Sequence, residues 1–261
     1  MPQAAGLASG RPPPYRSLAM TPERFHRLRR VLARRQPDLT VLMEVVHKPH
    51  NLSAVVRTLD AVGGFEAHAV TEEESVDLFH MLAGGAKRWV PVHTHPTLEQ
   101  AVAELRQRGF RLLAAHPAEG TVDFREVDYT KPTAILLGQE KDGLTDAAVA
   151  AADRWIAIPM KGMGASLNVS VAAALILFEA ERQRQAAGLY DRSRLPPERF
   201  EHTLFEWAYP EVARLCRETG RPYPALSDDG EILGHREDVD LDGEFVVVPP
   251  GLKARKTIWS S

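Results

Sequence analysis

Three loops of the chain concentrate side chains that could bind a ligand or support a reaction, and each follows an apolar run of strand length. The loops cover residues 47–51, 138–143 and 159–168. Ligands of open parallel sheets bind beyond the carboxyl ends of the strands. We therefore expect these loops to lie together and to form the functional site. The side chains in and just after them that could carry chemistry are Asn51, Arg57, Glu140, Ser166 and Asn168.

Several of these side chains also have ordinary structural explanations. Asn51 stands where the N-cap of the following helix is expected, so capping accounts for it equally well. Arg57 has the apolar neighbours Val55 and Val56, which predicts a half-buried guanidinium that requires an anion. Glu140 could orient a neighbouring side chain or cap the helix that begins near residue 145.

The glycine-rich third loop does not match the known phosphate-binding patterns. The chain has neither G-x-G-x-x-G at this loop nor G-x-x-x-x-G-K-[ST] anywhere, which disfavours a nicotinamide dehydrogenase. It also lacks H-E-x-x-H and G-x-S-x-G, and Ser166 has no obvious histidine base nearby. Cys216 is the one cysteine, so a disulfide within the chain and a cysteine zinc site are excluded. We expect no metal.

The elements that position these loops follow from changes in hydrophobic period. Runs of strand length are continuously apolar, which is typical of strands buried on both faces of a parallel sheet. The sequence therefore predicts an α/β domain with a mostly parallel sheet. The predicted strands cover residues 41–46, 67–70, 111–115, 133–137 and 155–158, and the predicted helices cover 52–62, 98–108 and 169–187.

The flanking segments have different compositions. Residues 1–19 are rich in Pro, Gly and Ala and are predicted to form a flexible tail, and residues 20–39 a basic helix with Thr21 as N-cap and Pro22 as its first residue. The α/β region that contains the three loops covers 40–188. A helical extension, with one helix over 198–218, covers 189–230, and an acidic tail or small hairpin covers 231–261.

Composition indicates a soluble protein, and its charge distribution leaves open whether it meets a polyanion. Of the 261 residues, 44% are hydrophobic and 26% charged, and no uncharged apolar stretch reaches the ~18 residues of a membrane span. One cysteine and no visible secretory signal predict a cytoplasmic protein. Residues 226–249 carry a net charge of −7. Because the whole chain has a net charge of −3, the remaining residues carry +4. Arginine-rich stretches at 24–35 and 182–199 could bind nucleic acid or simply solvate a surface.

Three segments together resemble the motifs of the SPOUT class of RNA methyltransferases. They are residues 47–54 with Arg57, residues 137–140, and residues 158–171. The resemblance implies a sheet whose C-terminal segment forms a deep trefoil knot, a homodimer, and S-adenosylmethionine as methyl donor. It places the cofactor on backbone near Ala115, Gly138, Ile158 and Leu167.

Further segments, at 33–40, 122–129 and 181–185, are similar to those members of the class that methylate the ribose 2'-hydroxyl of guanosine 18 in the D-loop of tRNA. Alternatives are 2'-O-methylation of another tRNA or rRNA nucleotide, and an RNA-binding module without catalysis. The resemblance assigns activation of the 2'-hydroxyl to Arg57. Because a neutral arginine is vanishingly rare, we favour Arg57 as a clamp on phosphate and developing alkoxide.

The same resemblance implies roles for the other side chains. Asn51 and Glu140 would hold Arg57, and Ser166 and Asn168 would orient the loop and the ribose. The predicted RNA contacts are Arg27, His50, Arg182 and Arg184.

Overall fold

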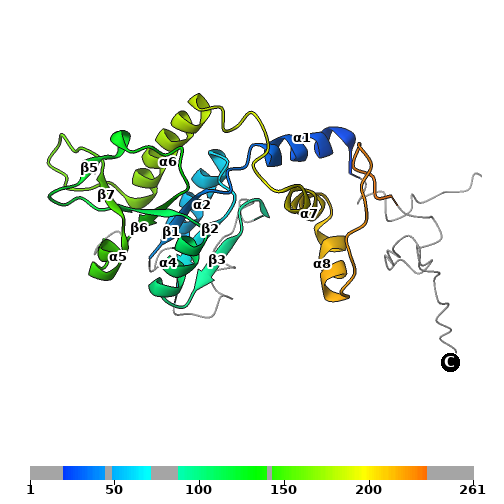
Figure 1. Cartoon of the computed structure of the whole chain (residues 1–261), viewed down its shortest axis with the longest axis horizontal. Helices are drawn as coiled ribbons and strands as arrows, with labels where there is room; N and C mark the ends of the chain where they lie inside the picture. Colours follow the sequence, from blue (N-terminus) through cyan, green and yellow to red (C-terminus); the bar gives the residue numbers. More distant parts are fainter. Residues whose placement is uncertain (1–19, 45–48, 72–87, 140–142, 234–261) are drawn as a thin grey trace, which may run out of the picture. The chain divides into compact units, whose positions relative to one another are not determined.

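The computed structural model describes residues 20–44, 49–71, 88–139 and 143–233 (Figure 1). The chain divides into two compact units. One comprises residues 31–196, and the other combines the described residues up to 30 with those from 197 onward. The predicted tail at 1–19 and most of the predicted acidic segment lie outside the described residues.

The larger unit is built on a parallel sheet. Its strand order is β3-β2-β1-β6-β4-β7-β5, and all of its pairings are parallel. Along the central pair, Leu39 lies opposite Thr133 and Met43 opposite Leu137, so β1 and β6 end together. The strands are β1 (Leu39–Met43), β2 (Ala67–Val70), β3 (Val92–His95), β4 (Arg111–Ala115), β5 (Val122–Asp123), β6 (Thr133–Leu137) and β7 (Arg154–Ala157).

Helices cover both faces of this sheet, which explains why its strands read as continuous apolar runs. Alternate residues of β1 enter different cores: Val41 packs with residues of α2 and α6, whereas Leu42 packs with residues of α4 and α5. Figure 1 shows the same two layers. The helices are α2 (Pro49–Ala61), α4 (Leu98–Gln107), α5 (Asp146–Ala151) and α6 (Val169–Ala186), with a short 3-10 turn at Phe124–Glu126.

The predicted α/β class with a mostly parallel sheet is confirmed. One boundary differs with consequences for the site, because α2 begins at Pro49 rather than at residue 52. Proline is tolerated in the first turn of a helix, so the helix starts earlier and Asn51 is its third residue. The expected N-cap role of Asn51 is therefore wrong. The trefoil knot stays a prediction.

The smaller unit contains the start of α1 (Pro22–Ala33) together with α7 (Pro197–Ala208) and α8 (Pro210–Glu218). The Thr21 hydroxyl accepts a hydrogen bond from the Arg24 backbone N–H at 3.3 Å, which matches the expected N-cap. The single helix predicted over 198–218 is wrong. It is divided before Pro210, which has no N–H to continue the ladder and restricts the residue before it.

The described C-terminal end forms a small hairpin. The Ser227 N–H donates to the Glu231 carbonyl at 2.8 Å, and the Leu233 N–H donates to the Ala225 carbonyl at 2.8 Å. Gly230 has a φ of +84°, and a Cβ there would lie 2.3 Å from the Phe25 ring. Only glycine fits that turn. The rest of the hairpin expected within 231–261 lies outside the described residues.

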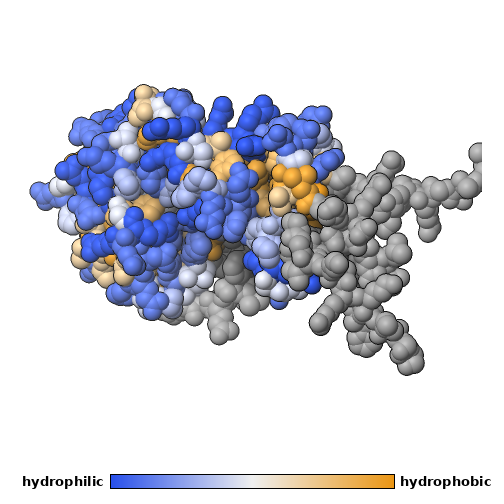
Figure 2. Space-filling model, turned by 45° about the vertical axis from the view of Figure 1, so that its right-hand side comes forward, coloured by the Kyte–Doolittle hydropathy of each residue, from blue (hydrophilic) through white to orange (hydrophobic). Residues whose placement is uncertain are grey.

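On the face drawn in Figure 2, hydrophilic residues predominate and hydrophobic ones form small patches among them. Within the described ranges, none of the helices is long and apolar enough to cross a membrane.

Candidate active site

A cavity of about 300 Å³ lies where the loops after β4, β6 and β7 meet the first turns of α6. These are carboxyl ends of parallel strands, where the sequence predicts ligand binding. The cavity is lined by residues 115–117, 137–139, 143, 156–158, 160, 165–167, 169, 172 and 176.

The four residues expected near a cofactor all line this cavity. Ala115 ends β4, Gly138 follows β6, Ile158 follows β7, and Leu167 precedes α6. They come together because the strands are in parallel register, with Ala114 opposite both Leu136 and Trp155. The four residues therefore line one cavity, and their binding of a cofactor stays a prediction.

Gly138 allows the loop after β6 to fold tightly against the cavity. A Cβ at Gly138 would lie 2.2 Å from the carbonyl carbon of Gly143, a separation that no side chain tolerates. The backbones of Gln139 and Gly143 also exchange two hydrogen bonds, of 2.9 and 3.1 Å. Gln139 and Gly143 therefore pair at the cavity wall, and Gly138 is required for the close approach of Gly143.

The wall offers mostly apolar side chains and backbone, with a few polar side chains among them. Ser166, a predicted site residue, lines the cavity, as do His116 and Gln139, which sequence reasoning did not single out. The signal was present, since His116 directly follows Ala115 at a strand end. The His116 ring lies edge-on to Trp155, with 6.2 Å between ring centroids. Such a wall suits a ligand that combines an apolar or aromatic part with several polar groups.

Asn168 has a definite structural role at the entrance to α6. Its Oδ1 accepts hydrogen bonds from the backbone N–H of Ser170 at 2.9 Å and from the Ser170 hydroxyl at 2.5 Å, and it is the N-cap of the helix. Asn168 thus fixes the first turn of α6, whose residues Val169 and Ala172 line the cavity. This geometry supports the predicted orientation of the loop.

The residues predicted from the first motif lie on α2, and none of them lines the cavity as far as the structure describes it. Asn51 is 9% exposed, whereas His50 and Arg57 are exposed. The expectation of a half-buried Arg57 is therefore wrong: its side chain points away from the apolar face of α2. No hydrogen bond or ion pair between Arg57 and the described residues occupies its guanidinium. Glu140 lies outside the described residues.

The arginines predicted to contact RNA differ in accessibility. Arg27 is exposed on α1. Arg182 is also exposed, and it donates two hydrogen bonds to Glu179, of 2.9 and 2.8 Å. This pairing raises the pKa of Arg182 and lowers the pKa of Glu179. Arg182 can therefore reach RNA only by exchanging or sharing an existing partner.

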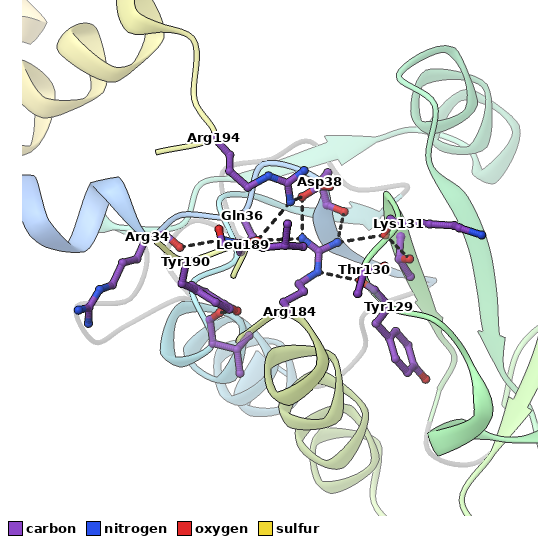
Figure 3. Close-up of polar contacts among 12 residues, drawn as sticks. Arg34, Gln36, Asp38, Tyr129, Thr130, Lys131, Arg184, Leu189, Tyr190 and Arg194 are labelled. Carbon is purple, nitrogen blue, oxygen red and sulfur yellow. Dashed lines mark hydrogen bonds and ion pairs between the residues drawn. The ribbon is translucent and has the colours of Figure 1, made fainter. Parts of the chain in front are cut away.

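Arg184 is fully buried, so the predicted RNA contact of Arg184 is wrong (Figure 3). Its guanidinium donates hydrogen bonds to the carbonyls of Tyr129 at 2.9 Å, Lys131 at 3.0 Å and Asp38 at 3.1 Å. It also donates to the Asp38 carboxylate at 2.6 Å and to Gln36 Oε1 at 3.0 Å. No donor faces solvent, and Arg184 instead ties the end of α6 to residues 36–38 and 129–131.

A metal centre has no basis in the described part of the chain, where no group of three or more His, Cys, Asp or Glu side chains is arranged to hold an ion.

Comparison with protein families assigns the chain. Residues 38–178 match the model of the SpoU rRNA Methylase family, and residues 182–235 match the C-terminal model of SpoU rRNA methylases. The first match covers the whole parallel sheet and the cavity. The chain therefore belongs to the SpoU methylase family.

Individual relatives are similar over most of the chain. The tRNA (guanosine(18)-2'-O)-methyltransferase of Escherichia coli (strain K12) is 53% identical over 82% of this chain and 94% of its own. The structure of the A. aeolicus TrmH/SpoU tRNA modifying enzyme covers 73% of this chain and 97% of its own, with 42% identity and a TM-score of 0.67. The methyltransferase AviRb from Streptomyces viridochromogenes, in complex with the cofactor AdoMet, has 28% identity, covers 58% of this chain and 60% of its own, and has a TM-score of 0.53.

Proposed function

We propose that this chain transfers a methyl group from S-adenosylmethionine to the ribose 2'-hydroxyl of guanosine 18 in tRNA. The observation that carries this proposal is the agreement between the cavity and the family. The loops that match the SPOUT motifs at 137–140 and 158–171 are the loops that enclose the cavity. The relative of that activity from Escherichia coli is similar along 94% of its length.

The residues of the cavity fit S-adenosylmethionine. Gly138 lets the backbone of Gly143 approach closely at the cavity wall, and the apolar wall of Leu137, Ile156 and Ile158 suits an adenine ring. His116, Gln139 and Ser166 are available for its polar groups. The cofactor has no phosphate, which explains why a glycine-rich loop without a phosphate-binding pattern lies here. When bound, S-adenosylmethionine supplies a methyl group on a positively charged sulfur.

Arg57 would act on the second reactant, the RNA. A charged guanidinium is a poor proton acceptor but a strong bidentate ligand of phosphate. The exposed guanidinium of Arg57 has no described protein partner, so it is free to hold an RNA phosphate and the developing charge on the ribose oxygen. Asn51 and Glu140 would hold Arg57, and Ser166 and Asn168 would orient the loop and the ribose. The proton leaves through phosphate or water.

Exposed basic side chains of each unit would contact the tRNA. Arg27, His50 and Arg182 are exposed and can contact phosphates, which fixes the orientation of the RNA without reading its sequence. Arg184 is not part of this set. Because the substrate is tRNA, the enzyme is expected to work in the cytoplasm.

A homodimer is part of the proposal. Along α6, Val171, Leu175 and Phe178 are 48%, 42% and 51% exposed, and their spacing of four and three places them on one face of the helix. An apolar stripe of this kind beside a ligand cavity is typical of a protein interface. A second copy of the same chain would cover it with the same stripe around a twofold axis. Leu175→Asp should then yield monomers in sedimentation velocity, whereas a wild-type monomer at micromolar concentration would contradict the dimer.

The test of the activity is transfer of labelled methyl to unmodified tRNA transcripts, followed by mapping of the protected 2'-oxygen. We expect one product, at guanosine 18, and no product from a transcript with a 2'-deoxyribose at that position. Label at another nucleotide would contradict guanosine 18 as the methylated position, but it would still show transfer of a methyl group to a ribose 2'-oxygen. Tight tRNA binding without any methyl transfer would favour the non-catalytic RNA-binding module.

A further inference from the structure

A buried carboxylate lies directly after β1 and has no cationic partner among the residues that the structure describes. Glu44 is only 6% exposed. Its two oxygens instead accept hydrogen bonds from one residue, Thr145: the backbone N–H donates at 2.9 Å and the hydroxyl at 2.5 Å. Burying a carboxylate without a counter-charge is unfavourable. An apolar side chain would fill this position at lower cost, so the contact itself requires an explanation.

Thr145 connects Glu44 to the cavity wall. Thr145 is the N-cap of α5, since its hydroxyl oxygen accepts a hydrogen bond from the Ala148 N–H at 3.2 Å. The same hydroxyl donates its own hydrogen bond to Glu44. Two residues earlier, Gly143 pairs with Gln139, and both line the cavity. Glu44 therefore holds a residue that lies two positions after Gly143 of the cavity wall.

Glu44 is also tied to the segment that leads to Arg57. Its backbone N–H donates to the Leu137 carbonyl at 2.9 Å, immediately before Gly138. Five residues after Glu44, α2 begins at Pro49 and carries Asn51 and Arg57. Glu44 thus contacts Leu137 before the Gln139–Gly143 pair and Thr145 after it.

We propose that Glu44 is a positioning residue for the methyl transfer: through Leu137 and Thr145 it holds the paired residues Gln139 and Gly143 of the cavity wall in a fixed position relative to the end of β1. This inference rests on the proposed function. Glu44 lines no part of the described cavity and acts through the loop alone. Pre-organisation of this kind lowers the ordering required when a ligand binds.

Four variants test this positioning role. Glu44→Ala and Thr145→Val remove it, whereas Glu44→Gln and Thr145→Ser keep hydrogen-bonding groups in place. A glutamine can still accept from the Thr145 N–H and can donate to the Thr145 hydroxyl oxygen. We expect Glu44→Ala to raise the Kd of S-adenosylmethionine about tenfold, the size of a lost hydrogen bond to a charged group, and to lower kcat at saturating cofactor. The two conservative variants should largely restore both values.

Glu66→Ala is the matched control. Glu66 is another buried carboxylate, 2% exposed, and it is paired with Arg108 away from the cavity. Glu66→Ala should lower Tm at least as much as Glu44→Ala does, yet leave the Kd of S-adenosylmethionine unchanged. If both variants raise that Kd in proportion to their loss of Tm, Glu44 merely stabilises the fold and the inference is overturned.

Amide hydrogen exchange separates this inference from the proposed function, because it needs no cofactor. In Glu44→Ala, the amides of Gln139, Gly143 and Thr145 should exchange faster, while those of β2 stay as in the wild type. If the wild type fails to bind S-adenosylmethionine, the proposed function fails, and the exchange result alone decides whether Glu44 holds the loop. Unchanged exchange of the Gln139, Gly143 and Thr145 amides in Glu44→Ala would contradict the positioning role of Glu44. Should Glu44→Ala not fold, Thr145→Val against Thr145→Ser gives the same decision.

Discussion

Two arginine sites on neighbouring helices show how differently the same side chain can be used. Helix α2 packs against α6, yet the outer face of α2 presents Arg57 to solvent, whereas the end of α6 buries Arg184 completely. The guanidinium of Arg184 has a protein acceptor in every direction (Figure 3). The guanidinium of Arg57 has none within the described structure. The comparison indicates that an arginine is available to a ligand only where the fold leaves its donors unpaired.

Replacing Arg184 should have the largest effect, and it should fall on stability. Arg184→Ala leaves the Asp38 carboxylate and several buried carbonyls without their donor, and removing one member of a buried ion pair costs about 3–5 kcal/mol. Arg194, 2.8 Å from Asp38, retains part of the pairing. Chemical denaturation should show the loss. A tRNA affinity that falls in the folded variant without any loss of stability would contradict the structural role.

Arg57→Ala should act in the opposite way. Because the side chain is exposed and unpaired in the described structure, the free energy of unfolding should change by less than ~0.5 kcal/mol. The rate of methyl transfer should fall about 100- to 1,000-fold, as expected when a charge-stabilising group is lost. Single-turnover kinetics at saturating cofactor measure this. A rate within a factor of about three of wild type would remove Arg57 from the mechanism.

The buried side chain of His68 should make the stability of the protein depend on pH. His68 on β2 is buried, its Nδ1 lies 2.9 Å from His95 Nε2, and burial lowers the pKa of His68 to about 4. His93 and His95 lower that pKa further, against the opposing effect of Glu66 and Glu104.

Between pH 6.5 and about 4, the unfolded chain binds a proton that the folded His68 does not. Stability should therefore be full above pH 6.5, fall by on the order of 3 kcal/mol as the pH decreases to about 4, and lose no more from this group below that. His68→Gln removes the titrating group, so its unfolding free energy should fall less steeply over this range. Identical slopes for the two proteins would show that His68 does not titrate as described.

Arg182→Ala should have the smallest effect. Each phosphate contact contributes about 0.7–0.9 to the slope of log affinity against log salt, so losing one should flatten that slope by this amount and weaken tRNA binding severalfold. Affinity for S-adenosylmethionine should not change. Filter binding over a range of salt measures both quantities. If the slope is unchanged, Arg182 stays paired with Glu179 and does not contact an RNA phosphate.

The sequence predicted the five strands that contain continuous apolar runs, whereas β3 and β5 lack such a run and were not among the predicted strands. Continuous apolar runs identify β4, β6 and β7, and the residues after parallel strands meet at one edge whatever the rest of the fold does. The burial of Arg184 was missed because its acceptors come from residues 36–38 and 129–131, far away in sequence. Spacing along α6 does not distinguish Arg184 from Arg182, since only the packing of α6 decides which one is enclosed.

Calorimetric titration of S-adenosylmethionine into two α6 variants tests the central claim, that the cavity holds the methyl donor. Ala172 lines the cavity, whereas Ala186 is exposed near the end of the same helix. Added side-chain volume in Ala172→Leu should occupy the space of the ligand and abolish binding, while Ala186→Leu should bind as the wild type does. Equal affinity in all three proteins would contradict the account and place the cofactor elsewhere.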